Sequence, residues 1–353
     1  MSSKQLTICV ILVLSMGVAG PATAQTATAD TYVVAPDGSG EFRTIGAALA
    51  VADDGDTVEV QPGVYRERLA IEDNVTLVAP DGAVLDGGQF TNSTALALGD
   101  ATDATIRGFT VRYYTVGVWA NGTDGDWTVA ELSVIGGTVG IEASNTTGDW
   151  AVANTTVAAT TDDALFAARS SGDWQIRDSR FDSPGGDGID AARTAGEWLT
   201  ADVVVTRPAT DGLDATGSTG DWTATDVRVS DAERGLKAIG ASGDWQARRV
   251  TVRDSPVGIT APRATGAWTV TDADVRAGGV AAFVGRTTGP WAIENSRLRG
   301  GIRGVYAFGT RGPWRISDTV VTTSDTPEAV GVDTREASGD WRTENVSVRV
   351  ATP

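Results

Sequence analysis

The stretch Thr147-Gly148-Asp149-Trp150 decides the fold of this chain, because copies of it recur along most of the sequence. Ten tryptophans follow one another at intervals of 23, 24, 24, 24, 23, 23, 23, 23 and 27 residues, and a glycine lies two positions before each of them. These tryptophans are Trp127, Trp150, Trp174, Trp198, Trp222, Trp245, Trp268, Trp291, Trp314 and Trp341. A near-constant period in this range is typical of proteins that stack one structural unit per repeat. The repeat therefore predicts a β-solenoid with one coil per copy.

Positions counted from each tryptophan predict three short strands in every coil. The residue two positions after the tryptophan is mostly apolar, the residue seven positions after it is always apolar, and a run of small and apolar residues lies ten to seven positions before it. Alternate side chains of a strand point to opposite faces, so the tryptophan and the apolar residue after it share the inner face. We expect the tryptophans to stack in the core about 4.8 Å apart. The alternative is an exposed aromatic row that binds sugar rings.

Two polar rows separate the strands. The fourth residue after the tryptophan is usually Asp or Asn, and the residue before it is acidic in the first six copies, at Asp126, Asp149, Asp173, Glu197, Asp221 and Asp244. Side chains of this kind bond nearby backbone groups in turns. We therefore expect both rows to be turn ladders.

Four segments are expected along the chain. Residues 1–24 resemble a secretory signal, with Lys4, a short apolar run and a small-residue cleavage site, although a membrane anchor is the alternative. Residues 25–56 should form an N-terminal strand and a helical cap, with a helix over 44–52 that covers the open end of the solenoid. Residues 57–126 should form irregular first coils, and residues 127–353 the regular coils. We expect a secreted, extracellular or cell-surface monomer without stable membrane insertion.

Composition excludes several kinds of chemistry. The chain has no histidine, and its only cysteine, Cys9, lies in the signal, so Ser-His-Asp and Cys-His catalysis are excluded and zinc or copper sites are not expected. No cofactor is predicted with certainty; a bound metal would be Ca²⁺ held by oxygen atoms. The net charge of −18 argues against nucleic acid as a partner and suits a halophilic source.

Function is expected where outward residues change from coil to coil. The position eight residues before the tryptophan lies on the third strand and reads Trp119, Glu142, Phe166, Asp190, Asp214, Lys237, Thr260, Phe283, Tyr306 and Asp333. Three residues earlier, the middle coils carry Asp163, Asp187, Asp211 and Arg234. Five carboxylates and two cations therefore converge on one side of the middle coils.

This arrangement predicts a candidate site for acid/base sugar chemistry. Closely spaced carboxylates raise one another's pKa values, which makes Asp187, Asp190 and Asp214 the candidate catalytic residues. The candidate substrate-binding residues are Asp163, Asp211, Arg234 and Lys237, together with aromatic side chains for sugar stacking at Trp119, Phe166, Phe283 and Tyr306. The same acids could bind Ca²⁺. The structural alternative is a salt-bridge network that joins Asp214 to Lys237 and Asp211 to Arg234.

The period, the short strands and the Gly-[Ile/Leu/Val]-x-Ala runs resemble right-handed parallel β-helix proteins of the pectate-lyase-like superfamily. That resemblance implies a protein that binds, cleaves or modifies polysaccharides. Residues 33–67 resemble the opening of pectin methylesterases, through Val34-Ala35-Pro36-Asp37-Gly38-Ser39-Gly40-Glu41-Phe42-Arg43-Thr44-Ile45 and Val58-Glu59-Val60-Gln61-Pro62-Gly63-Val64-Tyr65-Arg66-Glu67. The esterase motifs Gln-Asp-Thr and Asp-Phe-Ile-Phe-Gly are absent, so esterase activity is not implied.

The expected function is non-catalytic binding of a polysaccharide or cell-surface glycan, because no complete catalytic motif is present. One alternative is a polysaccharide lyase or glycoside hydrolase that acts on an acidic polysaccharide. A lyase of the pectate type needs calcium and an arginine base, and Arg253, Arg276 and Arg299 follow one another in three coils. A second alternative is a purely structural or adhesive surface protein.

Overall fold

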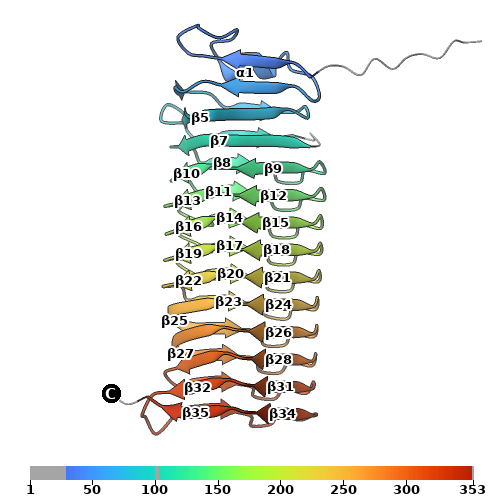
Figure 1. Cartoon of the computed structure of the whole chain (residues 1–353), viewed down its shortest axis with the longest axis vertical. Helices are drawn as coiled ribbons and strands as arrows, with labels where there is room; N and C mark the ends of the chain where they lie inside the picture. Colours follow the sequence, from blue (N-terminus) through green and yellow to red (C-terminus); the bar gives the residue numbers. More distant parts are fainter. Residues whose placement is uncertain (1–28, 100–102, 352–353) are drawn as a thin grey trace, which may run out of the picture.

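The computed structural model describes residues 29–99 and 103–351 of the 353-residue chain. These residues form a right-handed parallel β-helix, with coils stacked along one long axis (Figure 1). Its 35 strands belong to a single sheet, and every strand pairing is parallel. The predicted signal, residues 1–24, lies outside the described residues. No helix in the described residues is long and apolar enough to cross a membrane.

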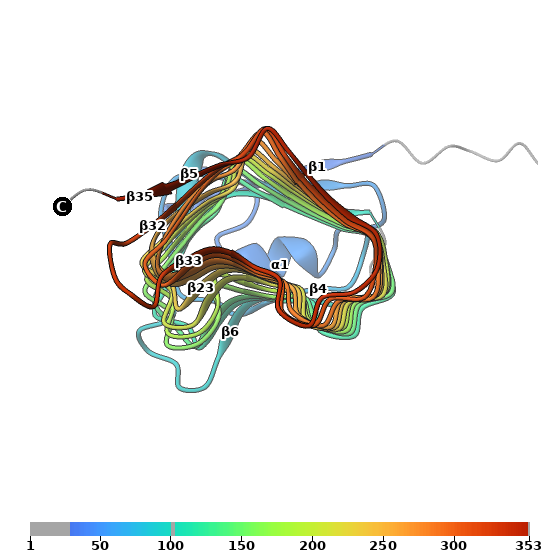
Figure 2. The same cartoon turned by 90° about the horizontal axis from the view of Figure 1, so that it is seen from below.

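A short N-terminal unit covers the first coil. Strand β1 (Thr31–Val34) pairs with β2 (Thr57–Val60), and the helix α1 (Ile45–Leu49) lies between them in the chain. Ile45 and Ala48 of α1 are buried, and Figure 2 shows α1 within the outline of the stacked coils. The carboxylate of Glu67 accepts the free N–H groups of Ile45 and Gly46 at 3.0 and 2.8 Å. The helical cap is thus confirmed, but it is shorter than the predicted 44–52.

The first coils are irregular, as expected, because some strands run on through the corners. The two long strands are β5 (Thr76–Asp86) and β7 (Ala104–Arg112). Both strands pair with each other across a register shift. The remaining strands here are β3 (Val64–Tyr65), β4 (Leu69–Ile71) and β6 (Thr94–Leu98).

The regular coils contain the three strands that the repeat predicts. Each sheet face is made by one strand of every coil, and we call these faces the tryptophan face, the second face and the third face. The tryptophan face is formed by β9 (Trp127–Ala130), β12 (Trp150–Ala153), β15 (Trp174–Arg177), β18 (Trp198–Ala201), β21 (Trp222–Thr225), β24 (Trp245–Arg248), β26 (Trp268–Thr271), β28 (Trp291–Glu294), β31 (Trp314–Ser317) and β34 (Trp341–Glu344). The second face is formed by β10 (Ser133–Ile135), β13 (Thr156–Ala158), β16 (Arg180–Asp182), β19 (Val204–Thr206), β22 (Arg228–Ser230), the first parts of β25 (Thr251–Thr260) and β27 (Asp274–Phe283), β29 (Arg297–Gly300), β32 (Val320–Thr323) and β35 (Ser347–Val350).

The third face carries the predicted site residues. It is formed by β8 (Val116–Trp119), β11 (Val139–Glu142), β14 (Leu165–Phe166), β17 (Ile189–Asp190), β20 (Asp211–Asp214), β23 (Arg234–Lys237), the last parts of β25 and β27, β30 (Arg303–Tyr306) and β33 (Val330–Asp333).

The tryptophans form a continuous stack inside the solenoid, which confirms the prediction that they belong to the core. Neighbouring indoles lie parallel, with interplanar angles of 2–6° and centroid separations of 4.7–5.1 Å. From Trp127 to Trp314 these side chains are 2–3% exposed. Trp341, in the last coil, is 47% exposed. Offset or parallel aromatic contacts of this kind add stability beyond the apolar area that they bury.

Glycine is required two positions before each tryptophan because the coils touch there. A Cβ atom on Gly196 would lie 2.1 Å from the carbonyl oxygen of Gly172 in the preceding coil, far inside van der Waals contact. The repeat Gly-Asp-Trp is therefore a corner at which the backbones of successive coils approach too closely for a side chain.

The Asp/Asn row four residues after the tryptophan owes its composition to backbone conformation. Asn154, Asp178 and Asp202 have φ of 47, 50 and 53°, in the left-handed region that Asn and Asp tolerate best among residues with a Cβ. The predicted side-chain-to-backbone ladder is replaced by contacts between side chains: Asn295 donates to Asp272, and Arg249 pairs with Asp226 at 2.7 Å.

Candidate functional site

The third face brings the predicted carboxylates side by side in successive coils. Phe166 pairs in register with Asp190, Asp190 with Asp214, and Asp214 with Lys237. Asp211 pairs in register with Arg234. The order predicted from the repeat is confirmed. We call the seven residues of this group the carboxylate cluster: Asp163, Asp187, Asp190, Asp211, Asp214, Arg234 and Lys237.

Two of the acids are ion-paired, as the structural alternative predicted. The Nζ atom of Lys237 lies 2.7 Å from Oδ2 of Asp214 and 2.9 Å from Oδ2 of Asp211. The Nε atom of Arg234 lies 2.6 Å from Oδ1 of Asp211. Asp211 and Asp214 are 1% and 6% exposed, so both carboxylates depend on these cations for neutralisation.

The other three acids have no salt bridge to a cation in the described residues, and their pKa values are raised. Burial is the largest cause, and it raises the pKa of Asp163 and of Asp187 to about 7 and that of Asp190 to about 6. Neighbouring carboxylates add to the rise, whereas backbone N–H donors oppose it: Asp163 accepts from the N–H of Asp187 at 2.6 Å, and Asp190 from that of Ala192 at 2.8 Å. The Thr210 hydroxyl also donates to Asp187.

A calcium ion would have to displace a built-in cation from this cluster. Carboxylate oxygens of Asp187, Asp211 and Asp214 lie within 4.8 Å of one another, a spacing that a metal ion could bridge. The Lys237 ammonium, however, already contacts two of these three residues. The residues therefore fit an acid cluster neutralised by the protein's own cations better than a calcium site.

The predicted aromatic residues do not surround the cluster together. Only Phe166 lies in a coil next to it, beside Asp190. Phe283 and Tyr306 stack on each other at 5.2 Å further along the face, with the Arg303 guanidinium over the Tyr306 ring. Trp119, 40% exposed, lies in the coil before Glu142.

The predicted arginine row on the second face is partly neutralised. Arg253 pairs with Asp274. Arg276 pairs in register with Arg299, and both are exposed. Of these three arginines, only Arg253 has a salt bridge within the described residues.

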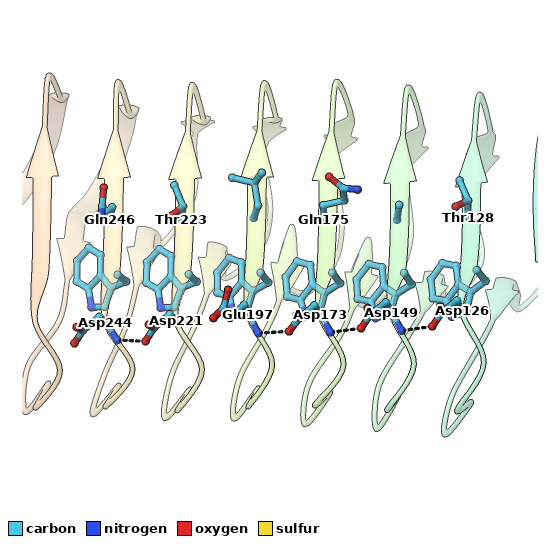
Figure 3. A pocket seen from close by; sticks show the side chains of 18 of the residues that line it. Asp126, Thr128, Asp149, Asp173, Gln175, Glu197, Asp221, Thr223, Asp244 and Gln246 are labelled. Atoms are coloured by element: carbon cyan, nitrogen blue, oxygen red, sulfur yellow. Dashed lines mark hydrogen bonds between the residues drawn. The ribbon is translucent and has the colours of Figure 1, made fainter. Parts of the chain in front are cut away.

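Sequence reasoning did not predict a groove that runs along the tryptophan face. It has a volume of about 990 Å³ and spans the coils from Ala104 to Trp268. One row of lining residues is acidic and the other is uncharged, at Thr128, Gln175, Thr223 and Gln246 among others, as Figure 3 shows. The signal in the sequence is the series of acids before the tryptophans. Their predicted ladder is confirmed, since Oδ1 of Asp126 accepts the N–H of Asp149, but the pattern does not indicate that they border a groove.

The raised pKa values predict a pH-dependent stability that one substitution should reduce. A carboxyl whose pKa is higher in the folded than in the unfolded state binds protons preferentially when folded, so its contribution is full below about pH 4 and is lost as the pH rises through about 7. We expect Asp187→Asn to raise the free energy of unfolding at about pH 8 relative to wild type, but not at about pH 4.

Urea denaturation at the two pH values measures this difference. Asp182→Asn is the matched control, because a hydrogen bond from Thr206 lowers the pKa of Asp182, and this variant should be less stable than wild type at the higher pH. An equal effect of Asp187→Asn at both pH values would contradict the prediction.

Comparison with known proteins supports the architecture. No family model matches the sequence, and no curated protein matches it. Among solved structures, the catalytic domain of a glycoside hydrolase family 87 α-1,3-glucanase, in an aspartate-to-alanine variant with bound nigerose, is 12% identical with a TM-score of 0.63 and covers 90% of this chain and 68% of that chain. A family 136 lacto-N-biosidase from Eubacterium ramulus is 10% identical with a TM-score of 0.59 and covers 91% and 68%. At these identities the likeness shows the fold.

Proposed function

We propose that this protein is a secreted carbohydrate-active β-helix protein, and that the carboxylate cluster hydrolyses a glycosidic bond. Two different kinds of carboxyl lie on adjacent strands: one has a raised pKa and the other is held in a salt bridge. This observation carries the proposal. Asp190 has a pKa raised to about 6, whereas Asp214 in the next coil is bonded to an ammonium group. Glycoside hydrolysis requires this division between a carboxylic acid and a carboxylate.

Asp190 would act as the proton donor. It is the more exposed of the two, it lies beside Phe166, and its environment keeps a proton available in weakly acidic to neutral solution. The bond between the anomeric carbon and the leaving oxygen breaks as that oxygen takes the proton of Asp190.

Asp214 would act on the sugar side of the scissile bond. Its charge is maintained by Lys237, and it would stabilise the positive charge that develops on the anomeric carbon or activate the attacking water. Asp187, which is less exposed than Asp190, holds the turn before β20 by accepting the N–H of Asp211 at 2.8 Å.

The structural neighbours support a carbohydrate as the substrate. The α-1,3-glucanase catalytic domain was crystallised with nigerose, and the other neighbour is a lacto-N-biosidase. An α-1,3-linked glucan is therefore the first member of a test panel, followed by β-linked glycans and acidic polysaccharides.

The test is to incubate the purified chain with this panel and to measure new reducing ends. We expect wild type to release reducing ends from at least one polysaccharide, and Asp190→Asn and Asp214→Asn to lose that activity. Asp182→Asn, which replaces an ion-paired acid on the second face, is the control that should retain it.

One observation favours a second candidate function, non-catalytic glycan binding. Asp211 and Asp214 are salt-bridged, and neither of the two grooves described on this molecule includes the carboxylate cluster. Retention of a polysaccharide without new reducing ends, and loss of retention in Asp190→Asn, would establish binding in place of hydrolysis. The absence of both cleavage and retention would overturn both candidates.

A further inference from the structure

The groove on the tryptophan face contains a row of carboxylates with a regular spacing. We call it the acid ladder; it consists of Asp103, Asp126, Asp149, Asp173, Glu197, Asp221 and Asp244. Each member comes from a successive coil, and the coils repeat every 4.7–5.1 Å along the tryptophan stack. All seven residues are exposed. The ladder ends where Ala267, Pro290 and Pro313 take the same position in the next coils.

The backbone fixes the orientation of these carboxylates. The Oδ1 atom of Asp126 accepts the N–H of Asp149 at 2.7 Å, and Oδ1 of Asp149 accepts the N–H of Asp173 at 2.8 Å (Figure 3). The same bond recurs from Asp173 to Glu197 and from Asp221 to Asp244. One oxygen of each of these aspartates is thus held by the next coil, while the second oxygen accepts none of the hydrogen bonds found in the described residues.

No cation of the protein neutralises this row within residues 29–99 and 103–351. Like charges directly opposite each other on neighbouring strands are destabilising. Elsewhere the protein separates or pairs such charges: Asn345 donates to Asp318, and Arg249 pairs with Asp226, in the row four residues after the tryptophan. Within the described residues the acid ladder has no such partners, as is also true of Arg276 and Arg299 on the second face, and it borders the groove on the tryptophan face.

The spacing of the carboxylates indicates which kind of positively charged polymer fits the row. In an extended peptide, side chains on one face recur about every 6.6–6.8 Å, out of step with coils that repeat every 4.7–5.1 Å. In an extended β-1,4-linked sugar chain each ring advances by about one coil spacing and successive rings face opposite ways, so that the amino groups on one edge recur near every second carboxylate of the ladder. The uncharged row beside the ladder, including Thr128, Gln175, Thr223 and Gln246, offers hydroxyl and amide groups to the ring hydroxyls.

We propose that the groove on the tryptophan face binds a linear polysaccharide with free amino groups, such as a deacetylated glucosamine polymer, with protonated amines on the acid ladder. This site goes beyond the proposed hydrolytic function, because it uses a different face and a different set of residues. Its length implies that affinity rises with the number of sugars until the chain spans the seven acids of the ladder.

Calorimetric titration of the full chain with a glucosamine oligomer long enough to span the ladder tests the proposal. The critical variant is the triple substitution Asp149→Asn, Asp173→Asn and Asp221→Asn, because the amide oxygen can still accept the N–H of the next coil. We expect it to weaken binding at low salt by about tenfold or more. Added salt should also weaken binding to the wild-type protein, because it screens the charges of the ladder.

A matched control removes the same charge from another row. Asp178→Asn, Asp202→Asn and Asp318→Asn lie four residues after their tryptophans, at a position where Asn154 and Asn295 already occur, and should leave the affinity unchanged. Asp190→Asn should also bind normally, so that failure of the hydrolytic proposal and failure of this one can be told apart.

Three further ligands identify the class of partner. Equal affinity for the N-acetylated oligomer would overturn the role of the amines. Tighter binding of an oligolysine than of the amino-sugar chain would assign the groove to basic peptides instead. Binding of calcium alone at the ladder, with no sugar binding, would make it a cation site and overturn the proposal.

Discussion

Replacing Trp222 with alanine is expected to lower the free energy of unfolding by about 3–5 kcal/mol. Trp222 is 3% exposed and stacks on Trp198 and Trp245 at 4.8 and 4.7 Å. Removal of its ring leaves a cavity between two rigid coils, and it breaks two aromatic contacts at once. Its indole N–H has no hydrogen-bond partner among residues 29–99 and 103–351, so the expected loss is one of packing.

Chemical denaturation followed by far-UV circular dichroism measures the loss. Trp341→Ala is the matched control, because Trp341 is 47% exposed and stacks on one neighbour, Trp314. We expect that substitution to cost clearly less. Equal losses for the two variants would mean that the stack contributes little to stability. Because repeat proteins can unfold in parts, the shape of the transition should be compared as well as its midpoint.

Replacing Lys237 with methionine is expected to destabilise the folded state by about 3–5 kcal/mol at neutral pH. The apolar part of the side chain is kept, but Asp214, 6% exposed, loses the one salt bridge that it forms with the residues described here. Asp211 keeps Arg234 as a partner. A buried carboxylate without a cation costs far more than the exposed pair of Arg207 and Asp182 contributes.

Urea denaturation of three variants separates this effect from other consequences of the substitution. Lys237→Met combined with Asp214→Asn should recover part of the lost stability, because the uncompensated charge is removed. Arg207→Met should change stability by no more than about 1 kcal/mol. The loss in Lys237→Met should also shrink in acid, as the orphaned carboxyl takes up a proton. A loss that is independent of pH and is not recovered in the double variant would contradict the explanation.

Much of the fold was predictable because the repeat is so regular. A period of two along a strand and a constant interval between strands placed Trp150 and Val152 inside, and put Asp190 and Asp214 next to each other. The merged strands β5 and β7 were not predicted, since the chain runs on through a corner where the sequence suggests a turn.

The candidate site was predictable in its members but not in its energetics. The sequence placed Asp187 in the cluster. Its pKa, however, depends on how deeply the side chain is buried and on the hydrogen bond from the Thr210 hydroxyl, and the repeat pattern indicates neither. The groove was missed for a different reason. Asp149 and Asp178 both read as turn acids, and only the three-dimensional surface shows that one row borders a hollow and the other does not.

At the Gly-Asp-Trp corner each residue stacks on the same residue type of the next coil. The number of coils, and so the length of the solenoid, can therefore change without altering these contacts. A coil such as residues 151–174 contacts copies of itself above and below, so that its duplication or removal would create no new kind of contact. One such step changes the acid ladder by one carboxylate and leaves the spacing intact. The number of repeats would therefore set the length of ligand that the groove can hold. Duplication of one repeat in the gene would lengthen the binding site by one coil and one carboxylate.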